Sequence, residues 1–234
     1  MSFAIVLAVL AALAFGTGLL VTRLQAVAKK RRLDEALSEA RRWVERLAGQ
    51  VLHLTGTNAA AKQALADASE RYTAAGSQLA LARTIGQAGL AKETALEGLY
   101  YIRAARVAMA LDPGPALPAD AERARAGAVT EHRKVEVEGA TYEASPRPGH
   151  DTPHYYPGGQ VAGRSVPEGW YNRPWWKPAL IGGAWGAGAA VLFGSLFAGM
   201  AGVAAAQAWQ DGFEAGGQGV FAPDDVGFDD LPDF

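Results

Sequence analysis

The chain has 234 residues, a formal net charge of −2 and no cysteine. The lack of cysteine excludes disulfides, thiolate metal sites and cysteine nucleophiles. The net charge argues against a dedicated nucleic-acid binder, which would carry a basic surface. Half of the residues are hydrophobic while the mean hydropathy is zero, so the apolar residues are concentrated in segments.

The first segment, residues 1–22, is predicted to be a transmembrane anchor. It carries no charged side chain from Ser2 to Thr22, and a helix of about 20 apolar residues crosses a hydrocarbon core of about 30 Å. A cleaved signal peptide is the alternative, because Ala26-Val27-Ala28 offers a small-residue cleavage site. The basic residues follow the apolar run, however, and its core is longer than that of a signal peptide, so an uncleaved anchor is favoured.

Residues 23–112 are predicted to form a cytoplasmic helical region with coiled-coil packing. Apolar residues alternate spacings of four and three from Leu33 to Leu54, and again from Ala61 to Ala82, which is the pattern of a coiled-coil seam. The short break at 55–58 favours an antiparallel helical hairpin or a three-helix coiled coil. The larger seam residues are Leu33, Leu37, Val44, Leu47, Val51, Leu65, Tyr72 and Leu79.

A change of pattern after the helices predicts a linker and then strands. Residues 113–133 are expected to be a linker with a short helix, because two prolines end the preceding helix. Residues 134–177 are expected to be a small β-rich or irregular juxtamembrane module. Polar and apolar residues alternate on both sides of the turn Glu138-Gly139, which predicts a hairpin. A second hairpin is expected around residues 160–165, after a turn at Pro157-Gly158-Gly159.

Residues 178–210 contain no ionisable side chain, and all 22 lysines and arginines precede them. This segment is predicted to be a second transmembrane helix. Aromatic residues and a terminal lysine favour the headgroup region, so six residues are assigned to the membrane interface: Trp170, Tyr171, Trp175, Trp176, Lys177 and Trp209. Small residues four apart allow close helix packing in lipid, and they are Gly194, Ala198, Gly202 and Ala206.

The charge distribution then predicts a topology. Basic residues follow the first run and precede the second, so the positive-inside rule places residues 23–177 in the cytoplasm of a bacterial cell and both termini outside. The tail, residues 211–234, has seven acids and no base, and it is predicted to be disordered. The predicted fold class is mainly α, with two transmembrane helices, a helical coiled coil and the small β-rich module.

The search for chemistry in the sequence yields no predicted catalytic, cofactor or metal site. His150, Asp151 and His154 are the best metal candidate, but Pro153 lies between the histidines and no third histidine or cysteine is near. A polar loop explains them better. No serine lies in a nucleophile-elbow frame, so the chain is not expected to be an enzyme.

Three stretches resemble an uncharacterised family of actinobacterial two-span membrane proteins. They are LEGLYYIRAARVAMALDPGPALP (96–118), TPHYYPGGQVAGRSVP (152–167) and GWYNRPWWKPAL (169–180). The resemblance covers most of the chain from about residue 38 to residue 210. It implies an N-terminal anchor, a helical region, an aromatic and proline-rich stretch and a Gly/Asp-rich tail, and it carries over no site residue.

Together these features predict a non-enzymatic integral membrane scaffold that presents a coiled-coil surface at the cytoplasmic face. Its expected partners are membrane lipid and either a second copy or another protein bound through the coiled coil, without nucleic acid. The alternative is an oligomeric pore built on the glycine-rich second run. A third class is an enzyme or ligand-binding module around residues 134–177.

Overall fold

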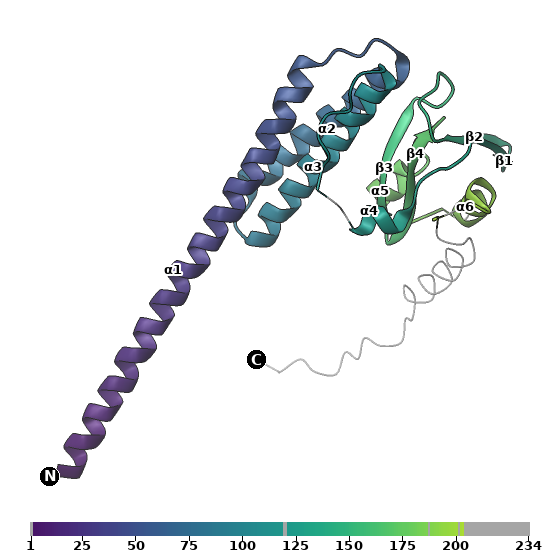
Figure 1. Ribbon diagram of the computed structural model, residues 1–234. Coiled ribbons are helices and arrows are strands. Elements are labelled where there is room, and N and C mark those ends of the chain that lie inside the picture. The colour runs from purple at the N-terminus through teal and green to yellow at the C-terminus, as the bar shows by residue number, and fades with distance from the viewer. Residues whose placement is uncertain (1, 119–120, 187, 201, 204–234) are drawn as a thin grey trace, which may run out of the picture. The chain divides into compact units, whose positions relative to one another are not determined.

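The computed structural model describes residues 2–118, 121–186, 188–200 and 202–203, apart from the side chains of residue 2 and of residues 4–21, 121 and 122. Figure 1 shows the described helices and strands in chain order. They are α1 (Ser2–His53), α2 (Ala59–Leu81), α3 (Ile85–Ala108), α4 (Ala121–Ala126), β1 (Arg133–Val137), β2 (Ala140–Ser145), β3 (His154–Val161), β4 (Arg164–Tyr171), α5 (Lys177–Gly182) and α6 (Ala189–Phe197).

The chain divides into two compact units. The bundle unit comprises residues 1–54 and 68–99, and the sheet unit comprises residues 55–67 and 100–234. The division cuts through α2 and α3. The sheet unit therefore includes the first turns of α2 and the last turns of α3 as well as the strands and the later helices.

The helix starts follow from local hydrogen bonds. The Asn58 side chain accepts a bond from the amide of Ala61 at 2.8 Å, so it caps α2. The same side chain donates to the carbonyl of Ala108, at the end of α3. In the bundle unit, Thr84 and Gln87 form a reciprocal cap at the start of α3. The Gln87 side chain accepts a bond from the Thr84 amide, and the Thr84 hydroxyl accepts one from the Gln87 amide.

Alanine dominates the core of the bundle unit. The fully buried side chains there are Ala40, Leu47, Ala68, Ala75, Ala88, Ala91 and Ala95. Small residues let the helices approach closely, and ion pairs join their rims: Lys92 of α3 lies 2.7 Å from Glu39 of α1, and Arg71 of α2 lies 3.6 Å from Glu97 of α3. Among the larger seam residues of this unit, Val44 and Leu47 are buried, and the others are half-buried: Leu33, Leu37, Val51, Tyr72 and Leu79. Leu65, in the sheet unit, is also half-buried.

Two glycines of α3 test this close packing. A Cβ added at Gly98 would overlap the buried side chain of Leu47, whereas one at Gly89 would meet nothing. Gly89→Ala should therefore stabilise the helix by about 0.5–1 kcal/mol, while Gly98→Ala should destabilise the bundle by about 1 kcal/mol or more, because overpacking outweighs that gain. Urea unfolding followed by helical circular dichroism measures both. Equal stabilisation by the two variants would contradict the packing of α3 against Leu47.

The sheet unit is built on an antiparallel sheet with strand order β1-β2-β4-β3. Glu138-Gly139 and Ala162-Gly163 form the two hairpin turns, and all four residues have positive φ. Two-residue loops of this kind match the twist of the flanking strands. The first hairpin is at the predicted position. The second turn is not, because Pro157-Gly158-Gly159 lies inside β3 and its pairing with β4 continues through these residues.

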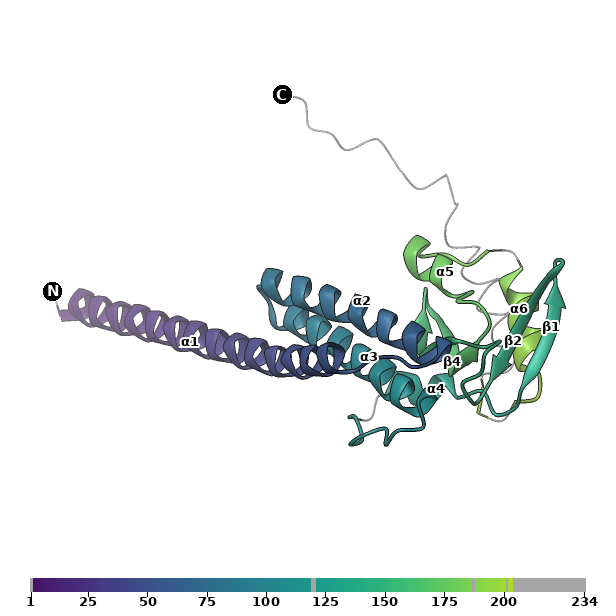
Figure 2. The same cartoon turned by 90° about the horizontal axis from the view of Figure 1, so that it is seen from above.

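The second apolar run is not one helix but a set of short elements that supply the core of the sheet unit. Gly183 ends α5 with a φ of 70°, and Gly199, with a φ of 74°, lies just past the end of α6. Between them, Leu192, Phe193, Leu196 and Phe197 are buried. They share a core cluster with residues of the sheet, including Val137, Ala144, Val166 and Tyr171. Figure 2 shows α6 beside β1 and β2, which it contacts.

This arrangement corrects the predicted fold class. The nine residues of α6 extend about 13 Å, far less than the roughly 30 Å of a hydrocarbon core. Of the helices whose side chains the structure describes, none combines the length and the apolar character that crossing a membrane requires. A fold of two transmembrane helices plus a coiled coil is therefore wrong. The described fold is instead a helical bundle with a four-stranded antiparallel sheet.

The same finding contradicts the integral membrane scaffold, the pore and the multi-pass location in a bacterial membrane, because all three depend on spanning helices. Several predictions concern parts of the chain outside the described residues. They are the anchor side chains at residues 4–21, the small-residue position Ala206, the interface residue Trp209 and the acidic tail at 211–234.

Candidate functional site

Four of the aromatic residues assigned to a membrane interface lie in or beside the core of the sheet unit, and the fifth, Trp209, lies outside the described residues. Trp170, Tyr171 and Trp176 are buried, and Trp175 is half-buried against the same cluster. Tyr171 packs on Trp176 with ring centroids 4.9 Å apart and donates a hydrogen bond to the carbonyl of Pro167 at 2.7 Å. Burial raises the pKa of the Tyr171 phenol well above its usual value. These rings therefore hold the strands and α5 together.

The small residues predicted to form one packing face do not do so. The strict four-residue spacing needs a continuous helix, but α6 ends at Phe197. Gly194 is half-buried on α6, while Ala198 and Gly202 lie after it and are exposed. Gly202 has a φ of 78°, which a helix does not use.

An aromatic pocket of about 430 Å³ opens in the sheet unit between the β1–β2 hairpin and the segment from Arg173 to Leu192. Its volume lies in the range of small-molecule sites. Trp175 and Trp185 form part of its wall, with ring centroids 5.7 Å apart and ring planes at 41°. Tyr142 of β2 contributes a third aromatic ring, and Leu192 and Val137 supply buried aliphatic surface.

The two indoles are fixed differently. The Nε1–H group of Trp185 donates to the carbonyl of Val161 at 3.0 Å, which ties this wall to the end of β3. The Nε1 atom of Trp175 is buried and has no hydrogen-bond partner among the described residues. A buried donor without an acceptor costs free energy, so the wall carries an unused hydrogen-bonding group.

Two charged residues of opposite sign line the aromatic pocket. Glu138 comes from the first hairpin turn, and Arg173 follows β4. The guanidinium of Arg173 lies 5.2 Å from the centroid of the Tyr142 ring, which is cation–π geometry. Within the part of the chain that the structure describes, neither Glu138 nor Arg173 forms an ion pair. The pocket thus combines three aromatic rings with one available carboxylate and one available guanidinium.

The sequence contained signals for this pocket, but they also fitted a membrane interface. Trp175 was assigned to the headgroup region, and Trp185 lay inside the predicted second span, residues 178–210. Glu138 was part of a predicted turn, and Arg173 was one of the cations beside the span. What the sequence could not show is that α5 and α6 fold back, which brings residues 137–142 and 173–192 to one pocket.

A second cluster joins three elements of the sheet unit. Asp67, buried near the start of α2, accepts a bond from Lys177 Nζ at 2.9 Å and another from Gln63 at 3.3 Å. The charges of Asp67 and Lys177 both affect the pKa of His154, at the start of β3. Burial lowers its pKa, Asp67 opposes that shift and Lys177 adds to it. Its Nδ1 atom is buried without a hydrogen-bond partner among the described residues, which also favours the neutral form of the imidazole.

The lowered pKa of His154 gives the fold a pH dependence. Above the ordinary pKa of 6.5 both the folded and the unfolded chains hold a neutral imidazole. As the pH falls below that value, the unfolded chain takes up the proton first, so the contribution to stability is lost. The free energy of unfolding should therefore fall more between pH 7.5 and 5.5 in the wild type than in His154→Gln.

The matched control for that comparison is His150→Gln. The side chain of His150 is 93% exposed and lies 3.1 Å from Asp151. This variant should keep the wild-type pH dependence in urea unfolding. If His150→Gln removed the dependence, or His154→Gln left it unchanged, the burial of a neutral His154 would be contradicted.

The histidines do not come together with acids as a metal site. His150 contacts Asp151 on the surface, whereas His154 faces Asp67 and Lys177. The residues that the structure describes include no group of three or more histidines, cysteines or acids able to hold a metal ion. The expectation of no metal, cofactor or catalytic residue stays a prediction.

The buried phenol of Tyr155 forms a further polar pair. It donates to Glu168 Oε1 at 2.6 Å and lies edge-on to Tyr101 of α3. Burial raises its pKa well above the usual value, and the negative charge of Glu168 adds to this. The phenol therefore stays protonated, which suits a structural link between α3 and β3 better than a nucleophile.

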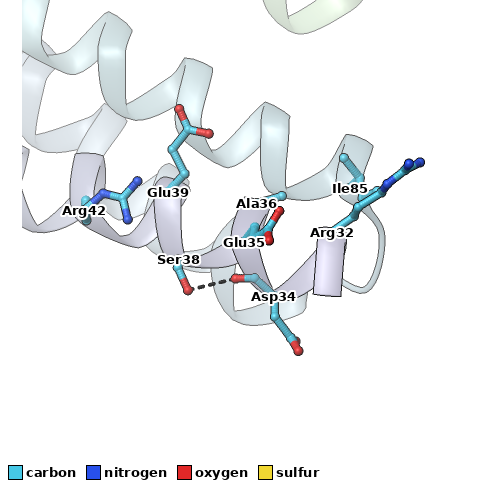
Figure 3. Close-up of a pocket in the computed structure, with 8 residues that line it drawn as sticks. All are labelled: Arg32, Asp34, Glu35, Ala36, Ser38, Glu39, Arg42 and Ile85. Atoms are coloured by element: carbon cyan, nitrogen blue, oxygen red, sulfur yellow. Dashed lines mark hydrogen bonds between the residues drawn. The ribbon is translucent and has the colours of Figure 1, made fainter. Parts of the chain in front are cut away.

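The bundle unit has an open groove of about 640 Å³ along α1. Figure 3 shows its charged side chains on successive turns of α1, with Ile85 at one end and a hydrogen bond of 2.8 Å from Ser38 to the carbonyl of Asp34. Most of these side chains are exposed. The groove is open and lined by solvated charges, so it does not enclose a ligand. The aromatic pocket is therefore the better candidate for a binding site.

No family model, curated protein or solved structure matches this chain. The resemblance to actinobacterial membrane proteins therefore stays a prediction.

Proposed function

We propose that the sheet unit is a binding module for a small molecule with an aromatic body. The observation that carries this proposal is the aromatic pocket, with the indoles of Trp175 and Trp185 on its wall. Aromatic rings provide large apolar contact areas and favour offset or edge-on contacts with another ring. The half-buried state of both indoles leaves part of their surface available to a ligand.

The environment of the pocket supports binding rather than a purely structural role. Trp176 and Tyr171 are buried in the interior of the sheet unit, whereas Trp175 and Trp185 pack against that core and are only half-buried. Ligand sites are mostly apolar with a few polar groups that orient the ligand. The pocket has this composition, because Glu138 and Arg173 are its charged lining residues.

The indole Nε1–H signals in a ¹⁵N–¹H spectrum of the full chain provide the test, since the chain has six tryptophans. The probe is 2-phenylethanol, a neutral aromatic molecule. It should shift the signals of Trp175 and Trp185 and leave that of Trp43 unchanged, because Trp43 lies on α1 in the bundle unit. Trp175→Leu should weaken binding about tenfold, through loss of ring contact and apolar area.

Trp43→Leu is the matched control, and it should bind the probe as the wild type does. Trp185→Phe is a second pocket variant that keeps an aromatic wall, and it should weaken binding less than Trp175→Leu. Unchanged backbone signals in each variant establish that it is folded. The proposal fails if 2-phenylethanol leaves the Trp175 and Trp185 signals in place, or if Trp43→Leu weakens binding as much as Trp175→Leu.

A further inference from the structure

We infer that the ligand of the aromatic pocket is a zwitterion, with an ammonium group bound at Glu138, a carboxylate bound at Arg173 and an apolar side chain against the indoles. A free aromatic amino acid is the simplest molecule of this class. The inference rests on the proposed function of the pocket and adds the chemical class of the ligand.

Several charged side chains of the sheet unit form ion pairs, whereas the two charged residues of the pocket form none with a described residue. Elsewhere, Lys134 lies 2.6 Å from Glu143, and Lys177 lies 2.9 Å from Asp67. Glu138 and Arg173 line one pocket, yet they pair neither with each other nor with another described residue. Opposite charges that stay apart across an apolar pocket complement a ligand that carries both signs.

Each charge is held at a defined place in the pocket. The carboxylate of Glu138 lies against the backbone of Gly188, where an added Cβ would come within 2.7 Å of Oε1. Gly188 immediately precedes α6. The guanidinium of Arg173 lies over the Tyr142 ring, and it forms no ion pair with a described residue that would occupy its N–H groups. A carboxylate accepts such donors well.

The backbone of Glu138 is an independent observation. It has a φ of 52° in the first central position of a two-residue hairpin turn. This position favours Asn, Asp or Gly, because they adopt positive φ at lower cost. Glutamate thus occupies a strained position, and strained residues occur preferentially at functional sites. A carboxylate on the longer glutamate side chain reaches Gly188 and the pocket.

Four probes with one phenyl ring separate the contributions of the charges. They are L-phenylalanine, phenethylamine (without the carboxylate), 3-phenylpropionate (without the ammonium) and neutral 2-phenylethanol. Titration of the full chain, followed through the Trp175 and Trp185 indole signals, should show L-phenylalanine binding about fivefold more tightly than either singly charged probe. That factor corresponds to an exposed ion pair.

The variants assign each charge to its residue. Glu138→Asn should abolish the preference for L-phenylalanine over 3-phenylpropionate, and Arg173→Gln should abolish the preference over phenethylamine. Glu138→Asn should also raise the folding equilibrium constant several-fold, since asparagine suits the turn. The matched controls are Glu136→Gln and Arg147→Gln, which are exposed residues outside the pocket, and both should keep the wild-type preferences.

The outcomes distinguish this inference from the proposed function. If all four probes bind equally, or if the two pocket variants keep the preferences, the zwitterion is contradicted while the aromatic site stands. Binding of 2-phenylethanol without binding of L-phenylalanine also contradicts it. If no probe shifts the Trp175 and Trp185 signals, the proposed function fails as well. The dipeptide L-phenylalanylglycine distinguishes two kinds of zwitterionic ligand. Tighter binding than L-phenylalanine indicates that the pocket takes a peptide terminus, and weaker binding indicates that it takes a free amino acid.

Discussion

Phe193→Ala should lower the free energy of unfolding of the sheet unit by about 3–5 kcal/mol, the usual cost of removing a buried phenyl ring. Phe193 is 1% exposed and packs on Phe197 with ring centroids 4.8 Å apart. Urea unfolding followed by tryptophan fluorescence measures the change, because five of the six tryptophans belong to the sheet unit.

Val191→Ala is the control for the same helix. Val191 is 57% exposed on α6, so its truncation should change the free energy of unfolding by no more than about 0.5 kcal/mol. The two residues are two positions apart in sequence, and one is buried while the other is exposed. Equal effects would contradict the packing of one face of α6 on the sheet.

Gly127→Ala should destabilise the sheet unit by about 3 kcal/mol or more. Gly127 has a φ of 73°, and an added Cβ would overlap the carbonyl oxygen of Gly202. A non-glycine residue at positive φ costs about 1–2 kcal/mol, and the overlap with backbone forces a further displacement. Gly127 also accepts a hydrogen bond from the amide of Glu168, so displacement disturbs the pairing beside β4. The same fluorescence measurement applies.

Gly114→Ala separates the two causes. Gly114 has a φ of 83°, but an added Cβ there would meet no atom within 4 Å. This variant should therefore show only the conformational cost of about 1–2 kcal/mol. A Gly127→Ala variant no less stable than Gly114→Ala would mean that the chain near Gly202 does not lie against Gly127.

Features of the fold that depend on neighbouring residues could be predicted from the sequence. The heptad spacing, the break at 55–58 and the prolines after residue 112 located the helical segments, because periodicity and helix breakers act locally. The Glu138-Gly139 turn located the first hairpin for the same reason. The second turn was misplaced, since Gly158 and Gly159 can adopt positive φ within a paired strand as well as in a turn.

The second apolar run shows where sequence reasoning failed. Hydrophobic content alone does not distinguish a spanning helix from short helices that fill a core. Gly183 and Gly199 both lie in the predicted transmembrane segment 178–210, but they end α5 and follow the end of α6 in left-handed conformations. Phe193 and Phe197 then face a sheet whose inner surface is also apolar. That pairing is a long-range contact, which no local pattern reveals.

The candidate site depends on the same long-range fold. Trp175 and Trp185 drew attention in the sequence, but their roles changed once α5 and α6 packed against the sheet. Glu138 and Arg173 lie 35 residues apart, and only the folded sheet unit places both at the aromatic pocket. The composition of the pocket was visible in the sequence, whereas its assembly was not.

Thiol accessibility along α6 tests most directly whether this apolar run packs on the sheet. The chain has no cysteine, so single-cysteine variants of the full chain can be labelled with a water-soluble maleimide without background. Val191→Cys and Ser195→Cys, on the exposed face, should react more than tenfold faster than Phe193→Cys and Leu196→Cys, on the buried face. The same labelling rate at all four positions would contradict the account.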